Sequence, residues 1–194
     1  MVKCISVLLP MFLFSVLIKA QTFEGLIQYQ SRQQGHIMTS EYFIKNSKSK
    51  IQLYLDDIAF SGYSLNLGSD LYNISELNKL IKKSKNKIVK GNIKLMKNKK
   101  KELILGYTCT LYEEERDTPY GNIIYYISDS LKANNQNGSK RVRNGRIVLK
   151  SVQSTYEVEA IEIKKMKLED KLFELPDYPI EEVDFEKLTK QYVR

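Results

Sequence analysis

The chain has 194 residues, 42% of them hydrophobic, and a formal net charge of +8. This length suits one domain with a substantial core. One histidine, two cysteines and no tryptophan argue against histidine-based nucleophilic catalysis, a disulfide framework and a sugar site built on tryptophan.

The first twenty residues are typical of a secretory signal peptide. Lys3 precedes an apolar run over residues 5–18, and Lys19 and Ala20 lead into a polar segment. The run has about 14 residues, short of the roughly 20 that span a bilayer, so cleavage after Ala20 is favoured over a transmembrane anchor. Cys4 precedes the run and cannot be a lipoprotein acylation site. We therefore expect export to the periplasm or beyond, with residues 21–194 as one soluble domain.

Short strands dominate the first part of this domain. Apolar and polar residues alternate over residues 23–30, 36–45, 51–55, 58–67 and 71–74, with polar turns between them. Short alternating segments at this spacing predict an antiparallel sheet and not βαβ units.

The sequence predicts one long helix, over residues 75–87. Ser75 can cap its first turn, and Glu76 suits the positive end of a helix. Leu77, Leu80 and Ile81 recur at helical spacing. We expect this amphipathic helix to pack on the sheet. A strand over residues 88–96 and a turn over residues 97–100 follow.

Residues 102–113 carry the clearest strand pattern and predict one central strand. Five residues would share one face of it, namely Leu103, Leu105, Tyr107, Cys109 and Leu111. Gly106 would bend the strand, and Cys109 would be a buried small hydrophobe.

The remaining chain predicts three more strands. Residues 122–129 are apolar on both faces, which is typical of a strand covered on both sides, and residues 132–144 are polar and predict an exposed loop. Two final strands fill residues 146–168. The phase of their alternation shifts near Ala160 and Ile161, which predicts a β-bulge there.

A family resemblance rests mainly on residues 104–112. Their sequence, Ile-Leu-Gly-Tyr-Thr-Cys-Thr-Leu-Tyr, resembles the I-x-G-Y-x-C-x-x-Y core motif of a periplasmic domain-of-unknown-function family related to the LolA/LolB lipoprotein carriers. Residues 23–25, 125–131 and 168–176 are similar to that family's first strand, post-motif strand and closing segment. The resemblance implies a mainly β (α+β) fold, in which a curved antiparallel sheet forms an incomplete β-barrel with a helix on its concave side.

In characterised relatives of that fold the cavity receives acyl chains of lipids or lipoproteins. Thirteen tyrosines would suit such a wall, since tyrosine has an apolar body and a polar tip. The candidate cavity residues are Tyr29, Tyr42, Ile44, Leu105, Tyr107 and Tyr125. Alternation alone does not separate a hollow barrel from one filled by its own side chains.

A run of eleven lysines without an acid extends from Lys79 to Lys101. Lysine suits phosphate groups without geometric selectivity, so the run predicts a surface for anionic lipid or an acidic protein; the alternative is a solvated face. Its candidate residues are Lys82, Lys83, Lys97, Lys99 and Lys100. Export and the lack of interleaved aromatics argue against nucleic acid.

No pattern in the sequence predicts catalysis. Neighbouring acids such as Asp56 and Asp57 would point to opposite faces of a strand, and His36 and Cys109 have no ligand spacing for zinc. We expect no enzyme activity, no metal and no cofactor. The first hypothesis is an exported carrier for an acyl chain, lipid or lipoprotein. The alternative is a periplasmic structural or adaptor module with a filled core and a lysine-rich partner surface.

Overall fold

The computed structural model describes residues 22–33, 35–85, 95–116, 120–134 and 141–184. The predicted signal peptide lies outside these residues. So do residues 86–94, which hold most of the strand predicted over residues 88–96. Among the described residues, no helix has the length and apolar character to cross a membrane.

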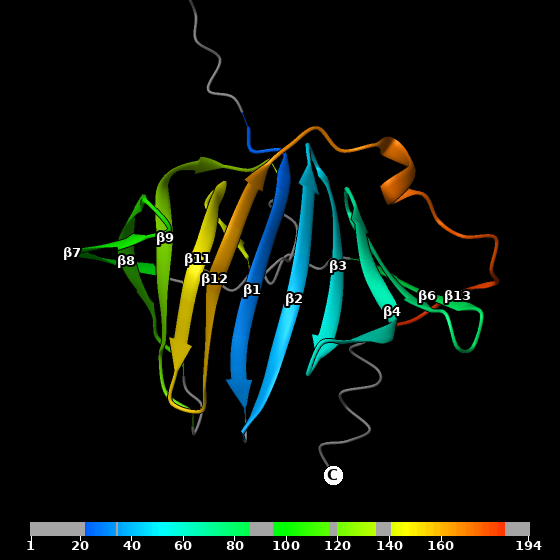
Figure 1. Cartoon of the computed structure of the whole chain (residues 1–194), viewed down its shortest axis with the longest axis horizontal. Helices are drawn as coiled ribbons and strands as arrows, with labels where there is room; N and C mark the ends of the chain where they lie inside the picture. Colours follow the sequence, from blue (N-terminus) through cyan, green and yellow to red (C-terminus); the bar gives the residue numbers. More distant parts are fainter. Residues whose placement is uncertain (1–21, 34, 86–94, 117–119, 135–140, 185–194) are drawn as a thin grey trace, which may run out of the picture.

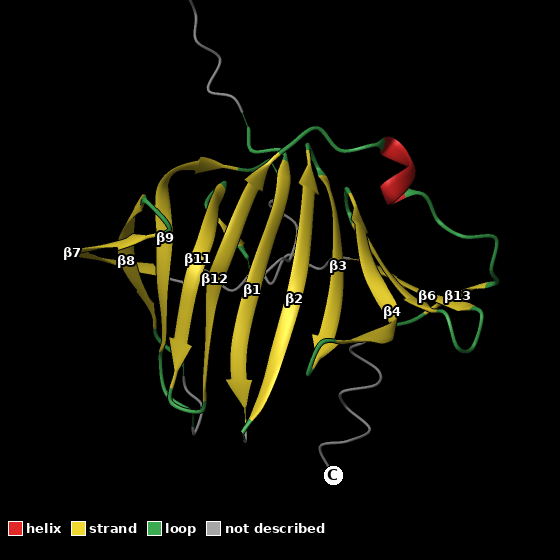
Figure 2. Cartoon of the chain, in the orientation of Figure 1, coloured by secondary structure: helices red, strands yellow, loops and turns green. Residues whose placement is uncertain are grey.

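The described residues form one large curved sheet and one short 3₁₀ helix (Figures 1 and 2). Its elements are β1 (Gly25–Gln33), β2 (His36–Lys45), β3 (Lys48–Leu55), β4 (Ile58–Leu67), β5 (Asp70–Ser75), β6 (Leu80–Lys85), β7 (Leu95–Ile104), β8 (Tyr107–Glu114), β9 (Ile123–Lys132), β10 (Val142–Arg143), β11 (Arg146–Gln153), β12 (Tyr156–Lys165), η1 (Asp170–Phe173) and β13 (Ile180–Glu182).

The strands follow the order β13-β6-β5-β4-β3-β2-β1-β12-β11-β9-β8-β7, and β10 pairs with β11 off this path. All pairs are antiparallel except β13 with β6, which is parallel. The sheet does not close, because β7 and β13 stand at its two ends. The prediction of a mainly β fold with a curved, unclosed antiparallel sheet is therefore confirmed, whereas the described residues place no helix on its concave side.

The predicted helix is wrong over the residues that can be checked. Ser75 ends β5, residues 76–79 form a turn, and β6 follows at Leu80. The backbone N–H of Asn78 does donate to Ser75 Oγ at 3.2 Å, as a helix cap would require. The turn closes at Lys79, whose φ is 49°. Leu77 is 78% exposed, so pairing of β6 with β5 and β13 outweighed the helical spacing.

The predicted central strand is instead a hairpin. β7 ends at Ile104, β8 begins at the paired Tyr107, and Leu105 and Gly106 form the two-residue turn. Both turn residues have positive φ, 49° and 80°, as a type I′ hairpin turn requires. Ile104 and Cys109 are buried, whereas Leu103 and Leu105 are exposed. The predicted apolar face therefore does not exist as one surface.

The predicted bulge near Ala160 is confirmed. Gln28 pairs with Glu162 and Tyr29 pairs with Ala160, so Ile161 is the extra residue. A bulge increases the local twist and bend of the sheet. It lies near the centre of the strand order, between β1 and β12 (Figure 1).

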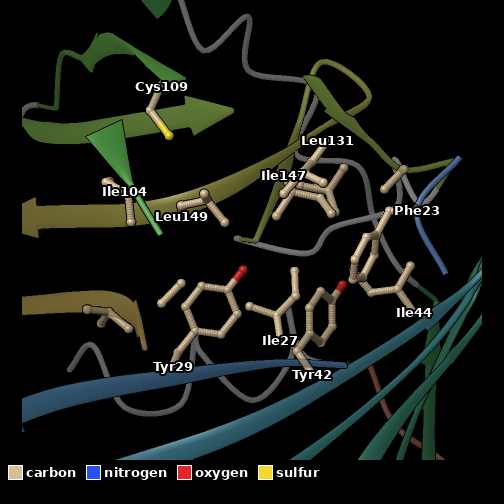
Figure 3. Close-up of a cluster of buried hydrophobic side chains, with 14 residues drawn as sticks. Phe23, Ile27, Tyr29, Tyr42, Ile44, Ile104, Cys109, Leu131, Ile147 and Leu149 are labelled. Carbon is tan, nitrogen blue, oxygen red and sulfur yellow. The ribbon is translucent and has the colours of Figure 1, made fainter. Parts of the chain in front are cut away.

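The main core lies where one end of the sheet folds back over the middle. Ile104 of β7, Cys109 of β8 and Leu149 of β11 share a buried cluster with residues of β1 and β2, although β12 stands between β1 and β11 in the sheet. Figure 3 shows these side chains between the two layers. We call this cluster the packed core; its other labelled members are Phe23, Ile27, Tyr29, Tyr42, Ile44, Leu131 and Ile147.

A second cluster lies on the opposite, outer face of β4, β5 and β6. Leu65, Ile74 and Ile81 pack there against Leu168 and Phe173 of the segment that carries η1. That segment continues to β13, where the N–H of Ile81 donates to Pro179 O at 2.9 Å and the N–H of Val183 donates to Lys83 O at 2.8 Å. The chain after β12 thus covers the outer face of β4, β5 and β6.

Candidate functional site

A groove of about 330 Å³ runs over β3, β4 and β5. Its apolar lining includes Ile51, Leu53 and Phe60, and its polar lining includes Ser64 and Asn73. Ile51 pairs with Tyr42 of the packed core, and paired residues in neighbouring strands share a face. The groove therefore lies on the concave face, beside the packed core.

An irregularity in β4 shapes this groove. Gln52 pairs with Tyr63 and Tyr54 pairs with Ala59, so Leu53 faces the extra residues of β4 between them. Extra residues interrupt the ladder and leave carbonyls without ladder donors. Gln52 Nε2 lies 3.2, 3.1 and 3.2 Å from the carbonyl oxygens of Leu53, Phe60 and Gly62. The Gln52 amide thus replaces the missing backbone donors.

Gly62 lets β4 and β5 approach closely behind the irregularity. A Cβ atom at this position would lie 2.4 Å from the carbonyl oxygen of Ile74, well inside contact distance. The strand can therefore follow this path only without a side chain there.

The groove is amphipathic. Leu53 and Phe60 are 39% and 46% exposed, and Leu55 and Ile58 extend the exposed apolar surface to the tip of the β3–β4 hairpin. At the other end, Ser64 Oγ donates to Asn73 Oδ1 at 2.7 Å. An apolar ligand body could lie along the first part, with a polar head at the second.

The residues predicted to line a cavity lie elsewhere. Tyr29, Tyr42 and Ile44 are fully buried in the packed core, and Tyr107 is partly buried against it. The Tyr29 hydroxyl donates to Val148 O at 2.9 Å, and burial raises the pKa of Tyr29. These side chains fill the space between the layers (Figure 3).

The other two predicted cavity residues do not join them. Tyr125 belongs to a separate buried cluster that includes Tyr112 and Val148. Leu105 lies in the β7–β8 turn and is 46% exposed. The groove residues Leu53 and Phe60 were missed, and the one sequence signal for them was a glycine inside a strand pattern, Gly62.

The five lysines predicted as one basic surface are divided between the two ends of the sheet. Lys82 and Lys83 are on β6, whereas Lys97, Lys99 and Lys100 are on β7 (Figure 1). Lys83 Nζ lies 3.8 Å from Asp70 and 3.5 Å from Glu182, and the nearby Asp70 carboxylate raises the pKa of Lys83. Lys82 and Lys83 point to opposite faces, since they are adjacent on a strand.

A buried carboxylate on β8 is the other chemically notable group. The Tyr125 hydroxyl donates to Glu114 Oε2 at 2.7 Å, and Arg116 Nε donates to Glu114 Oε1 at 2.5 Å. Arg143 lies over the Tyr125 ring, 5.2 Å from its centroid. The hydrogen bond to Glu114 raises the pKa of Arg116. The Glu114 carboxylate is thus paired with the Arg116 guanidinium, and its hydrogen bond with Tyr125 joins β8 to β9.

His36 and Cys109 lie in unrelated places. His36 is exposed, with Nδ1 3.3 Å from Asp56 Oδ2 at the ends of two hairpins. Cys109 is buried in the packed core, and burial raises the pKa of its thiol to about 12. Within the described residues, no three His, Cys, Asp or Glu side chains are grouped to hold a metal ion.

Comparison with known proteins gives the fold alone. No protein-family model and no curated protein matches the chain. Two crystal forms of PNGF-II match with a TM-score of 0.61, at 19% and 18% identity over 87% and 88% of this chain. The chain spans only about a third of the PNGF-II length, 32% and 33%.

A third solved structure is of similar size. An uncharacterised conserved protein from Thermus thermophilus matches with a TM-score of 0.58 and 9% identity, over 85% of this chain and 93% of its own. The similarity to LolA/LolB carriers remains an expectation from the sequence motif.

Proposed function

We propose that this protein is an exported, non-enzymatic binding or carrier protein that takes an amphipathic or apolar ligand in the groove over β3–β5. The supporting observation is the groove itself, with exposed Leu53 and Phe60 at one end and the Ser64–Asn73 pair at the other. Its volume of about 330 Å³ lies at the lower end of the roughly 300–1,000 Å³ of ligand pockets.

The size of the groove sets the expected affinity. A methylene occupies about as much volume as a water molecule, roughly 30 Å³, so the groove takes on the order of ten methylenes. Full burial of ten would contribute about 8 kcal/mol and one-sided cover about half as much, and the free-energy cost of association is subtracted from either figure. We therefore expect weak binding, as suits reversible carriage.

Binding of the neutral fluorescent probe N-phenyl-1-naphthylamine tests this function. The purified protein should enhance its fluorescence saturably. Leu53→Thr combined with Phe60→Thr should weaken binding about tenfold, since it removes contacts worth about two methylenes. Leu103→Thr is the matched control, because Leu103 is exposed on β7 at the other end of the sheet. No saturable binding, or equal losses in both variants, would reject the proposal.

Export is the second part of the proposal and has its own test. Amino-terminal sequencing of the protein recovered outside the cytoplasm should begin at Gln21, following Ala20. Recovery of the uncleaved chain in the membrane fraction would instead support the transmembrane anchor.

One observation supports the alternative function, a structural or adaptor module. The packed core fills the space beneath β1, β2 and β12, as a module with a filled interior requires. Its proposed lysine surface is divided between β6 and β7, so an acidic partner would have to bind one end at a time. A pull-down with Lys97, Lys99 and Lys100 replaced by Glu tests the β7 end separately.

A further inference from the structure

A lysine on the next strand, β6, lies beside the polar end of the groove. Ile51 pairs with Ser64, Ser64 with Asn73, and Asn73 with Lys82. Residues paired across strands share a face, with Cβ atoms about 4.5–5.5 Å apart. One row on the concave face therefore runs from an apolar side chain through a hydroxyl and an amide to an ammonium group.

Lys82 is the residue of the lysine run that lies in this row. Its neighbours Ile81 and Lys83 face outward, where Ile81 joins the outer cluster and Lys83 approaches Asp70 and Glu182. Lys82 is exposed and forms no ion pair with any residue that the structure describes. Its charge is thus available to a molecule in the groove.

The amide beside it is also arranged for an acceptor. Asn73 Oδ1 already accepts a hydrogen bond from Ser64 Oγ at 2.7 Å. The part of the Asn73 amide left for a ligand is therefore Nδ2, which only donates. A donor next to an ammonium group recognises an anion.

The acid closest to the groove in sequence is turned away from it. Glu76 Oε2 accepts a hydrogen bond from the Tyr178 hydroxyl at 2.7 Å and lies 3.3 Å from Lys79 Nζ. Tyr178 packs against the outer cluster, so this carboxylate is engaged at the outer face. A second acid, Glu181 of β13, pairs with Lys82 and shares its face. Glu181 lies on the far side of Lys82 from Asn73 and forms no ion pair with it, so the side of Lys82 toward the groove faces the Asn73 amide.

The apolar part of the row indicates the chemical nature of the rest of the ligand. From Ile51 to Leu55 the strand advances about 13 Å, and the exposed Leu53, Leu55, Ile58 and Phe60 border that path. The groove takes on the order of ten methylene-sized groups, which suits one chain and not the two chains of a phospholipid.

We propose that the ligand is a free single-chain anionic amphiphile of the fatty-acid type, with its tail along Leu53 and Phe60 and its carboxylate at Asn73 and Lys82. This inference rests on the proposed function, since it specifies the ligand of the same groove. It goes further by predicting selectivity for the sign of the head-group charge.

Two ligands with the same tail and opposite head-group charge test this selectivity. Decanoate and decyltrimethylammonium are titrated into the purified protein by calorimetry, below their micelle-forming concentrations. Decanoate should bind about tenfold more tightly. Raising the salt from about 0.01 M to about 1 M, which shortens the Debye length from about 30 to about 3 Å, should remove most of this preference.

Substitution at Lys82 assigns the effect to one residue. Lys82→Met should weaken decanoate binding about threefold, as expected for an exposed ion pair, and Lys82→Glu should reverse the preference. Lys82→Arg should retain it. Lys99→Met is the matched control, because it removes the same charge from β7 and should change nothing.

The two proposals fail in different ways. If N-phenyl-1-naphthylamine does not bind, the groove is not a ligand site and both proposals are rejected. If the neutral probe binds but decanoate and decyltrimethylammonium bind equally well, or Lys82→Met and Lys99→Met behave alike, only the anionic ligand is rejected.

Discussion

The two halves of the concave face differ in what covers them. Over β12, β1 and β2, strands from the far end of the sheet fold back, and Ile104, Cys109 and Leu149 fill the space. Over β3, β4 and β5 the same face keeps a groove of about 330 Å³. One curved sheet can therefore be filled at one end and hollow at the other, so the structural and the binding roles fall to different strands.

The largest effect is expected when a side chain is removed from the filled half. Leu149→Ala should lower the free energy of unfolding by about 2–5 kcal/mol, since Leu149 is fully buried and leaves a cavity. Leu53→Ala in the groove should cost about 0.5 kcal/mol. Urea denaturation of both variants measures the difference. Equal losses would mean that the groove is part of the core.

A smaller effect is expected in the β7–β8 hairpin, which belongs to the layer that folds back over the middle of the sheet. Leu105 has a φ of 49° in the β7–β8 turn, a conformation that costs an ordinary residue about 1–2 kcal/mol. Leu105→Asn should therefore raise the free energy of unfolding by about 1 kcal/mol, because Asn-Gly suits this turn. Leu103→Asn, two residues earlier on β7, is the control and should give no gain. A loss at Leu105 would contradict the hairpin.

The smallest effect concerns the segment that covers the outer face behind the groove. The hydrogen bond from Tyr178, and then the contacts with Lys79, hold the pKa of Glu76 below its usual range. A lowered folded-state pKa contributes stability above the unfolded-state value, about 4.3, and that contribution is lost as the pH falls through the folded-state pKa.

Amide exchange can follow this segment locally. Protection of the Val183 amide, which donates to Lys83 O at 2.8 Å, should fall below about pH 4.3 after correction for intrinsic exchange. Glu76→Gln should remove that dependence. The Cys109 amide in the packed core is the internal control, and a parallel fall there would indicate global acid unfolding.

Part of the fold could be predicted because the sequence records it locally. The shift of alternation at Ala160 and Ile161 is visible in the chain, and the bulge lies there. The β7–β8 hairpin was hidden, because exposed leucines at 103 and 105 continue the apolar alternation through the turn. The helix over residues 75–87 was predicted from spacing that a turn and a strand also fit, and only sheet pairing decides between them.

The candidate site could not be predicted from the sequence, since its one local signal, Gly62 inside a strand pattern, does not by itself indicate a groove. Gln52 reaches across to the carbonyls of Phe60 and Gly62, and this long-range contact shapes the groove. The tyrosines predicted as cavity wall did fall on apolar strand faces. Whether such a face meets a ligand or another layer depends on where β7, β8 and β11 fold, which alternation does not record.

The most direct test of the regional account is a ¹⁵N-resolved NMR titration with N-phenyl-1-naphthylamine. The account predicts that amide shifts concentrate at residues 51–55, 60–64 and 73–75, while Tyr29, Cys109 and Ile147 in the packed core stay unchanged. Shifts centred on the packed core, or spread evenly over both halves of the sheet, would contradict it.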